Sequence, residues 1–375
     1  MGLYDSLIYN RDSVAYNKLP DYYAYTDESG SFEITNIKSG SYGLIAFDDQ
    51  RQDFKLNSGL ETMAYVDTLI RVDGNVDGLK LKSFKPEGIQ RFIGARQQTN
   101  NSILFGFNRP VMDFDIHVTN NPDDSVSRFV FDKNRDSISY FFANKPDSLV
   151  FAWREGSLGT DTSVVKLRNM KASKIEVKLK DKEIRAADTI TFESKAPLQI
   201  GVNSYYILDG KDTIKEEYIS EVPFAYKYNF YYKPKSKTFK LILPEGFFTS
   251  FEGSKTDSIG YDITFLKPED LGTLDFLVRV EDDTSTPYIL NLVEEATGVL
   301  LIEKSFVGQT TVNLRNVKPR KFKARLIKDV DKNGEWTTGS LAEGRQPEPI
   351  LHYTEAIEMR ANWDMEMEWI VTPKE

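Results

Sequence analysis

The segment DVDKNG (329–334) offers the best-spaced oxygen ligands for a metal ion in this sequence. Asp329, Asp331 and Asn333 alternate along the chain, as the first ligands of a helical calcium loop do. Gly334 permits the sharp turn that such a loop needs, and the backbone carbonyl of Glu335 would be the next ligand. The sequence therefore predicts a calcium site whose ligands come from Asp329, Asp331, Asn333 and Glu335.

The second half of this loop departs from the helical pattern. The twelfth position, which supplies a bidentate Glu in helical loops, is Ser340, and Glu343 follows three residues later. A loop without that carboxylate should bind calcium weakly, at roughly 10⁻⁴–10⁻³ M, unless a β framework folds Glu343 back. The alternative is an ordinary hairpin turn rich in Asp, Asn and Gly.

A second group of possible metal ligands lies in MDFDIHV. Asp113, Asp115 and His117 alternate, so their side chains share one face of a strand. Two carboxylates and an imidazole can bind a transition metal. The competing interpretation is a solvated outer face, which is what an alternating strand normally presents to water.

Catalytic constellations are missing from the sequence. Histidine occurs only at His117 and His352, and no G-x-S-x-G elbow accompanies either, so a Ser–His–acid triad is not predicted. No Gly-rich phosphate loop is present. The 57 Asp and Glu residues leave carboxylate-based glycoside hydrolysis open, because spacing in sequence does not give spacing in space. We predict no catalytic residues, no organic cofactor and no enzyme.

Net charge and cysteine content restrict the possible partners and origin of the protein. The formal net charge is −9 and no block of Lys or Arg stands out, which argues against nucleic acid as a partner. With no cysteine the chain has no disulfide framework, zinc ribbon or thiol chemistry, and this favours a bacterial origin over a secreted immunoglobulin array. No apolar run reaches the roughly 18 residues of a transmembrane helix.

The elements that must position these residues are β-strands. Period-two alternation predicts strands at 102–107, 114–118, 127–131, 137–142 and 148–153, separated by clusters of Asn, Pro, Asp and Gly. Residues 288–304 predict a hairpin that turns at Thr297-Gly298. Short strands without intervening helices indicate an all-β fold of tandem small antiparallel β-sandwiches.

Two strands carry conspicuous aromatic faces. In FAYKYNFYYK, one face consists of Phe224, Tyr226, Tyr228, Phe230 and Tyr232. We interpret this face as sandwich core, with a sugar-stacking platform as the alternative. In RANWDMEMEW, the Trp and Met side chains of 363–369 share one face, which we also expect to be core, or a protein-binding stripe if exposed.

Polar or Pro/Gly breaks divide the chain into four expected domains: 1–84, 85–170, 171–271 and 272–375. Residues 32–49 align with 311–329, so that Asn36 faces Asn316 and Asp49 faces Asp329. The first and last domains therefore read as two copies of one sandwich. Because DDQRQDF (48–54) lacks the glycine of the second copy, we predict no second calcium site there.

The run TDESGSFEITNIKSGSY (26–42) resembles the carboxypeptidase-regulatory-like, or prealbumin-like, sandwich, with Ig-like units expected between the two copies. The segment from KDVDKNGEW to ANWDMEMEW (328–369) resembles the end of Ig-like-domain surface lipoproteins of Bacteroidota. Such relatives begin with a lipoprotein signal and a further Ig-like domain. The resemblance thus implies a missing N-terminal part, an incomplete first domain, and anchoring to the outer membrane or cell surface through a lipidated Cys upstream.

These observations favour a non-catalytic scaffold or protein-binding protein of the bacterial surface. Its expected partners are outer-membrane or surface proteins and, as a further class, glycans. The first alternative is a carbohydrate-binding accessory module that uses exposed aromatic faces such as that of Tyr226. The second alternative is a carboxylate-based hydrolase, which would need two carboxylates about 5–10 Å apart in a cleft.

Overall fold

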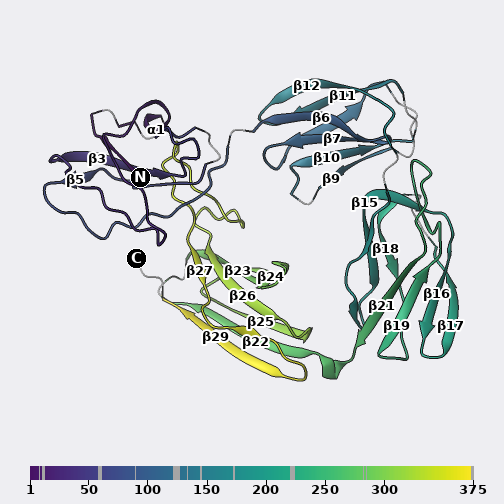
Figure 1. Cartoon of the computed structure of the whole chain (residues 1–375). Coiled ribbons are helices and arrows are strands. Elements are labelled where there is room, and N and C mark those ends of the chain that lie inside the picture. Colours follow the sequence, from purple (N-terminus) through teal and green to yellow (C-terminus); the bar gives the residue numbers. More distant parts are fainter. Residues whose placement is uncertain are drawn as a thin grey trace. The chain divides into compact units, whose positions relative to one another are not determined.

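The computed structural model is built almost entirely of strands (Figure 1). It describes residues 1–7, 9–10, 13–57, 61–88, 90–120, 127–132, 134–143, 146–171, 174–219, 224–281, 283 and 285–372. The chain divides into two compact units, one made of residues 1–89 and 273–375 and the other of residues 90–272. Among the described helices, none is long and apolar enough to cross a membrane. The predicted all-β fold is confirmed.

The first domain contains one sheet, in the order β2-β1-β3-β4, with β5 also pairing with β3. Its strands are β1 (Gly2–Asp5), β2 (Tyr22–Tyr23), β3 (Gly40–Phe47), β4 (Met63–Tyr65) and β5 (Ile70–Val72), and a short helix, α1 (Val14–Asn17), follows β1. Apolar side chains alternate along β3, so each face of the sheet carries its own buried cluster.

The second sandwich packs two sheets, β6-β7-β10-β9 and β12-β11-β8, around one aromatic core. The strands are β6 (Phe92–Thr99), β7 (Ser102–Phe107), β8 (Phe114–Val118), β9 (Arg128–Phe131), β10 (Ser137–Phe141), β11 (Ser148–Glu155) and β12 (Gly159–Lys166). The five strands predicted between 102 and 153 all exist, with ends that differ by at most two residues. Alternation alone located them because each has one face in the core.

The third sandwich joins a sheet β13-β15-β18, to which β20 adds, with a second sheet, β14-β21-β19-β16-β17. The strands are β13 (Val177–Leu179), β14 (Glu183–Arg185), β15 (Ile190–Ile200), β16 (Ser204–Asp209), β17 (Asp212–Glu217), β18 (Ala225–Phe230), β19 (Thr238–Leu243), β20 (Phe248–Ser250) and β21 (Ile259–Leu266). The short 3-10 helix η1 (Pro268–Asp270) follows β21.

The aromatic face of β18 is core, as expected, and not a sugar platform. Phe224, Tyr228 and Phe230 are buried, with at most 8% of each residue exposed. Tyr226 is half-buried, and its ring lies edge-on to Phe141 of the second sandwich, with 5.8 Å between ring centroids. The alternative prediction of a sugar-stacking platform at Tyr226 is therefore wrong, because packing within the sandwich and against its neighbour covers these rings.

The last sandwich contains a three-stranded sheet, β25-β22-β29, and a sheet β24-β23-β26-β27, with β28 also pairing with β26 (Figure 1). The strands are β22 (Gly272–Val280), β23 (Pro287–Glu294), β24 (Leu300–Val307), β25 (Gln309–Val317), β26 (Lys321–Lys328), β27 (Ile350–His352), β28 (Ile357–Glu358) and β29 (Asp364–Val371). β23 and β24 form the predicted hairpin, in which Gly298 has φ +67°. Most pairs are antiparallel, but β29 runs parallel to β22.

The Trp and Met face of β29 is largely core. Met365, Met367 and Trp369 pack against the buried cluster of the last sandwich. Trp363 lies outside the strand and is 48% exposed, and Arg360 covers its ring at 4.9 Å from the centroid. The prediction holds for the strand itself and is wrong for Trp363, since the chain has not yet entered the sheet there.

The structure supports the internal repeat strand by strand. β3 pairs with β1, β4 and β5 in the same register in which β26 pairs with β23, β27 and β28. Ahead of each return strand, the matching residue has a left-handed backbone in both copies, with φ 58° for Asn36 and 56° for Asn316. Asn tolerates this conformation better than most residues, so the shared turn explains the shared residue type.

A loop of the last sandwich is inserted into the first. Leu341 is 5% exposed and belongs to the buried cluster around Tyr4, Met63 and Tyr65. The hydroxyl of Thr338 donates to the carbonyl of Lys85 at 2.8 Å. We call residues 338–346 the clamp. It explains why the two ends of the chain form one compact unit.

Two further contacts hold the clamp. The Gln346 amide donates to the Tyr65 carbonyl at 3.1 Å and to the Asp67 carboxylate at 2.9 Å. Gly339 lies so close to the ring of Phe84 that a Cβ added there would be 2.8 Å from three ring atoms. Hence the backbone of the clamp lies directly on the aromatic core of the first domain.

Candidate functional site: an acidic loop beside the clamp

Three carboxylates meet in the loop that leads from β26 to the clamp. Asp329, Asp331 and Glu348 each have a carboxylate oxygen within 4.8 Å of the others. Asp329 and Glu348 are 2% and 7% exposed, whereas Asp331 faces solvent. Carboxylate oxygens at this spacing are ligands that Ca²⁺ and other hard cations prefer, so the cluster can hold a metal ion.

Backbone hydrogen bonds give the loop its shape. The N–H groups of Asn333 and Gly334 donate to the two carboxylate oxygens of Asp329, at 3.1 and 3.0 Å. Gly334 has φ +81° and Lys332 has φ 62°, so the chain turns sharply around the Asp329 carboxylate. Glycine adopts this left-handed conformation without steric cost, which agrees with its place in the sequence motif.

The other two predicted ligands, Asn333 and Glu335, lie in the same loop. The Asn333 amide donates to Asp331 at 3.2 Å and to Thr337 at 2.7 Å, and its oxygen accepts the Glu335 N–H at 2.7 Å. The side chain of Glu335 is exposed. Glu343, the proposed substitute for the twelfth ligand, pairs instead with Arg345 at 3.3 Å.

Sequence reasoning missed Glu348. Its carboxylate accepts the N–H of Val330 at 2.6 Å and that of Thr337 at 2.9 Å, so it spans both ends of the loop. The ligand pattern of a helical calcium loop ends at its twelfth position, which is Ser340 here, and so does not include Glu348. The signal that could have found it is the glutamate at the matching place in the first copy.

The loop of the first copy folds in the same way. Asp49 accepts the N–H groups of Asp53 at 3.2 Å and Phe54 at 2.8 Å, as Asp329 does from Asn333 and Gly334 in the second copy. Glu61 accepts the N–H of Asn57 at 2.9 Å, which matches Glu348 and Thr337. Phe54 adopts φ 61° where the second copy has glycine.

The two loops carry opposite charges at one matching position. The alignment places Arg51 opposite Asp331, and Arg51 donates to the Asn57 side chain at 3.3 Å. At this position the first loop carries a cation, whereas the second carries one of the three carboxylates of its cluster. Among the ion pairs of the described residues, none involves Asp329, Asp331 or Glu348.

The acidic loop leads directly into the clamp. The indole N–H of Trp336 donates to the Glu348 carbonyl at 3.1 Å, and Thr338 follows with its bond to Lys85. An ion bound by Asp329, Asp331 and Glu348 would tie the two strands of this loop together. It would thereby restrain the residues that dock into the first sandwich.

The second candidate metal group does not assemble in the same way. Asp113 forms a two-point ion pair with Arg154, at 3.0 and 3.1 Å, across to the neighbouring strand β11. Asp115 and His117 are exposed on the edge strand β8. The solvated-face interpretation accounts for all three side chains, because the guanidinium already neutralises one carboxylate.

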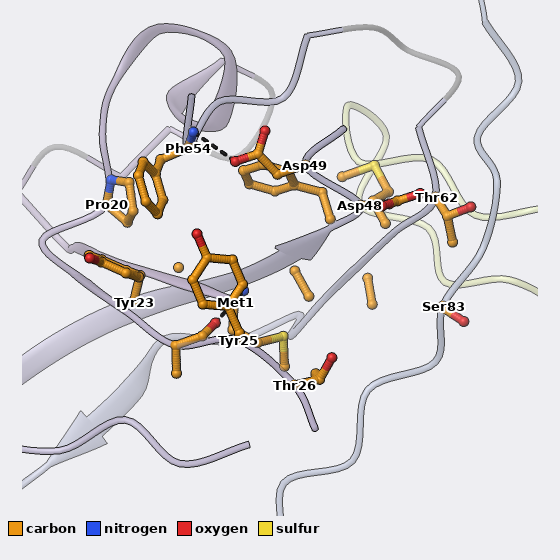
Figure 2. A pocket seen from close by; sticks show the side chains of 16 residues that line it. Met1, Pro20, Tyr23, Tyr25, Thr26, Asp48, Asp49, Phe54, Thr62 and Ser83 are labelled. Carbon is orange, nitrogen blue, oxygen red and sulfur yellow. Dashed lines mark hydrogen bonds between the residues drawn. The ribbon is translucent and has the colours of Figure 1, made fainter. Parts of the chain in front are cut away.

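A small aromatic pocket lies on the first domain (Figure 2). It has a volume of about 400 Å³, and its lining includes Tyr23, Tyr25 and Phe54 beside Asp48 and Asp49. The ring centroids of Tyr23 and Phe54 are 4.6 Å apart, and the two tyrosines are 54% and 67% exposed. Exposed rings beside carboxylates can stack on and hydrogen-bond a polar ring ligand such as a sugar.

Comparisons with known proteins give no family. No protein-family description matches the sequence, and no curated protein matches it. Solved structures that share its general build include titin domains A168–A170, at 10% identity over 64% of this chain and 92% of that chain, with a TM-score of 0.17. Bacteroides ovatus SGBP-B in complex with a mixed-linkage heptasaccharide is similar at 9% identity over 89% of this chain and 84% of that chain, with a TM-score of 0.23. The S-layer protein rSbsC is similar at 7% identity over 73% of this chain and 41% of that chain, with a TM-score of 0.27.

Proposed function

We propose that this chain is a non-catalytic scaffold or protein-binding protein of the bacterial cell surface. Its four sandwich domains would span 1–84, 85–170, 171–271 and 272–375, and a lipid anchor upstream would attach it to the outer membrane. The observation that carries the proposal is the clamp. With Leu341 buried in the core of the first domain, the two ends of the chain form one compact unit, as a rigid scaffold requires.

The broad and decisive test is a pull-down from outer-membrane extract, with the anchored full-length protein as bait. A stoichiometric surface partner, retained after washing, is the expected result. A catalytic activity on glycan or peptide substrates, or the lack of any partner from several bacterial membranes, would contradict the scaffold function.

We further propose that the acidic loop binds calcium and thereby stiffens the clamp. The internal repeat supports this, since the first loop holds Arg51 where the second holds Asp331. At 10 mM calcium and a dissociation constant of about 10⁻⁴–10⁻³ M, linkage adds roughly 1.4–2.7 kcal/mol to the stability of the last sandwich. The expected readout is a rise in Tm with calcium that chelator reverses.

The repeat supplies a matched variant for this test. Asp331→Arg copies the first loop, so it should keep the fold and lose the calcium response. Glu335→Gln alters an exposed side chain and should keep the response, because only the carbonyl of Glu335 was predicted to bind. An equal calcium response in D331R and the unaltered chain would show that calcium acts elsewhere.

The pocket of Figure 2 favours a second candidate function, glycan binding. Tyr25 is 67% exposed on its rim, whereas the Tyr226 face is packed away. A glycan array should show binding that Tyr25→Ala weakens at least tenfold and that Tyr231→Ala, at a 75% exposed tyrosine outside this pocket, leaves unchanged. Equal loss in both variants, or no binding, would remove this candidate.

A further inference from the structure

Asparagine followed by glycine occurs once in this sequence, at Asn333-Gly334 in the acidic loop. Both residues are exposed. Apart from the neighbours of Gly334 in the chain, no atom of the described residues lies within 4 Å of the place that a Cβ on this glycine would take. The backbone nitrogen of a glycine can approach the side-chain amide of the preceding asparagine without obstruction, and the two can close a succinimide ring. The acidic loop therefore contains a peptide bond at which the backbone can attack a side chain.

Hydrogen bonds of the folded loop surround the groups that would react. The Gly334 N–H donates to the Asp329 carboxylate at 3.0 Å, so the nitrogen that must lose a proton faces an acceptor for it. The side-chain oxygen of Asn333 accepts the Glu335 N–H at 2.7 Å, and this donor can stabilise the negative charge that an attack places on the oxygen. The side-chain nitrogen of Asn333 donates to the Thr337 hydroxyl at 2.7 Å. Attacking nitrogen, carbonyl oxygen and leaving nitrogen thus each have a polar partner.

The first copy of the sandwich shows that a carboxylate fits at this place in the loop. The alignment sets Asp53 opposite Asn333. Asp53 accepts the Lys55 N–H at 3.0 Å, as Asn333 accepts the N–H of Glu335. The backbone N–H groups of Asp53 and Asn333 each donate to the aspartate that begins their loop. An aspartate at position 333 can therefore keep the hydrogen bonds that shape the loop.

We propose that Asn333 is a site of spontaneous deamidation in the folded protein. The backbone nitrogen of Gly334 gives up its proton and forms a bond to Cγ of Asn333. The Cγ–Nδ2 bond breaks, and Nδ2 takes up a proton and leaves as ammonia. Water then opens the succinimide: addition at Cγ restores the Gly334 N–H and yields aspartate, whereas addition at the main-chain carbonyl carbon of residue 333 yields isoaspartate. No atom is oxidised or reduced in these steps.

The two products would change the acidic loop in opposite ways. The aspartate product adds a carboxylate beside the cluster of Asp329, Asp331 and Glu348, since the Asn333 amide already lies 3.2 Å from Asp331. Calcium affinity rises with the number of charged ligands, so this consequence rests on the proposed calcium function. The isoaspartate product lengthens the main chain by one carbon ahead of Gly334 and displaces the N–H that binds Asp329. It should therefore weaken the calcium response.

The test incubates the full chain, folded and free of calcium, at physiological temperature and follows its peptides by mass spectrometry. Deamidation replaces an amide NH2 by OH, and an isoaspartyl methyltransferase labels the isoaspartate product. We expect conversion at Asn333 while Asn101 and Asn203, which precede serines, keep their amides. An intact Asn333 in the folded chain, conversion only after unfolding in urea, or equal conversion at all three residues would overturn the proposal.

Two variants separate the modification from its effect on calcium. Asn333→Gln is the matched control, because the longer side chain slows ring closure, and it should show no conversion. Asn333→Asp copies the first product and should bind calcium with a dissociation constant at least tenfold lower than that of the fresh chain. If Asn333 converts but neither the fresh chain nor N333D responds to calcium, the deamidation stands and the calcium function falls. If the chain responds to calcium and Asn333 stays intact, the calcium function stands and the deamidation falls.

Discussion

Replacing Leu341 by alanine tests whether the clamp completes the core of the first domain. Leu341 is 5% exposed, yet it belongs to the last sandwich by sequence and to the cluster of Tyr4, Met63 and Tyr65 by packing. Leu→Ala in a core costs about 2–5 kcal/mol, the lost burial plus the cavity. Because Leu341 lies on a loop that can relax into the space, we expect the lower end, about 2–3 kcal/mol.

A loss of this size shifts the ratio of docked to undocked clamp by a factor of roughly 30–150. Hydrogen exchange read by mass spectrometry localises the effect. Exchange should accelerate in β4 and around Phe84, where the clamp docks, and stay unchanged in β23 of the last sandwich. The control is Leu301→Ala, at a 41% exposed position, which should alter neither region.

Two outcomes would refute this reasoning. Unchanged exchange in β4 of the Leu341→Ala variant would mean that the first domain holds its core without the clamp. Equal acceleration in β4 and β23 would mean that Leu341 stabilises the last sandwich itself, and that the two ends of the chain are not joined through this side chain.

Two further predictions concern single residues. Gly339→Ala should destabilise the docked clamp by about 1–3 kcal/mol, because its Cβ would lie 2.8 Å from ring atoms of buried Phe84; an unchanged urea midpoint would contradict that contact. Burial opposes ionisation of Asp209, but hydrogen bonds from Ser236, the Lys235 N–H and Tyr232 outweigh it and lower its pKa from 3.8 to about 2. Since the folded pKa lies below the unfolded one, the stabilisation is present above about pH 4 and is lost as the pH falls toward 2, by about 2 kcal/mol. Urea titrations at these pH values should show this loss in the unaltered chain and a smaller one in Asp209→Asn, and identical pH profiles would contradict it.

Local pattern was enough for the strands. Side chains alternate across a strand. When one face of each strand is buried, apolar and polar residues therefore alternate in the sequence, as in 102–107 and 114–118, and this pattern predicts the strand. Turn chemistry is similarly local: Asn36 and Asn316 mark the same left-handed residue in both copies. Long-range pairing is not local, and no pattern showed that β29 would run parallel to β22.

In the candidate site, too, some residues were predictable from local sequence and others were not. Asp329, Asp331 and Gly334 are close in sequence, and their spacing alone predicted a turn around a carboxylate. Glu348 lies beside them only because the chain leaves the acidic loop, docks the clamp into the first domain and then returns to the loop. A contact of this kind depends on the complementary shapes of two distant surfaces.

By itself, then, the sequence determined the all-β class, the repeated sandwich and one half of an acidic loop, because each of these is encoded in residues a few positions apart. The tertiary structure decided the rest. It buried the aromatic face of β18 and placed a loop of the last sandwich in the core of the first. These features depend on which surfaces exclude water together, and that is a property of the folded chain as a whole.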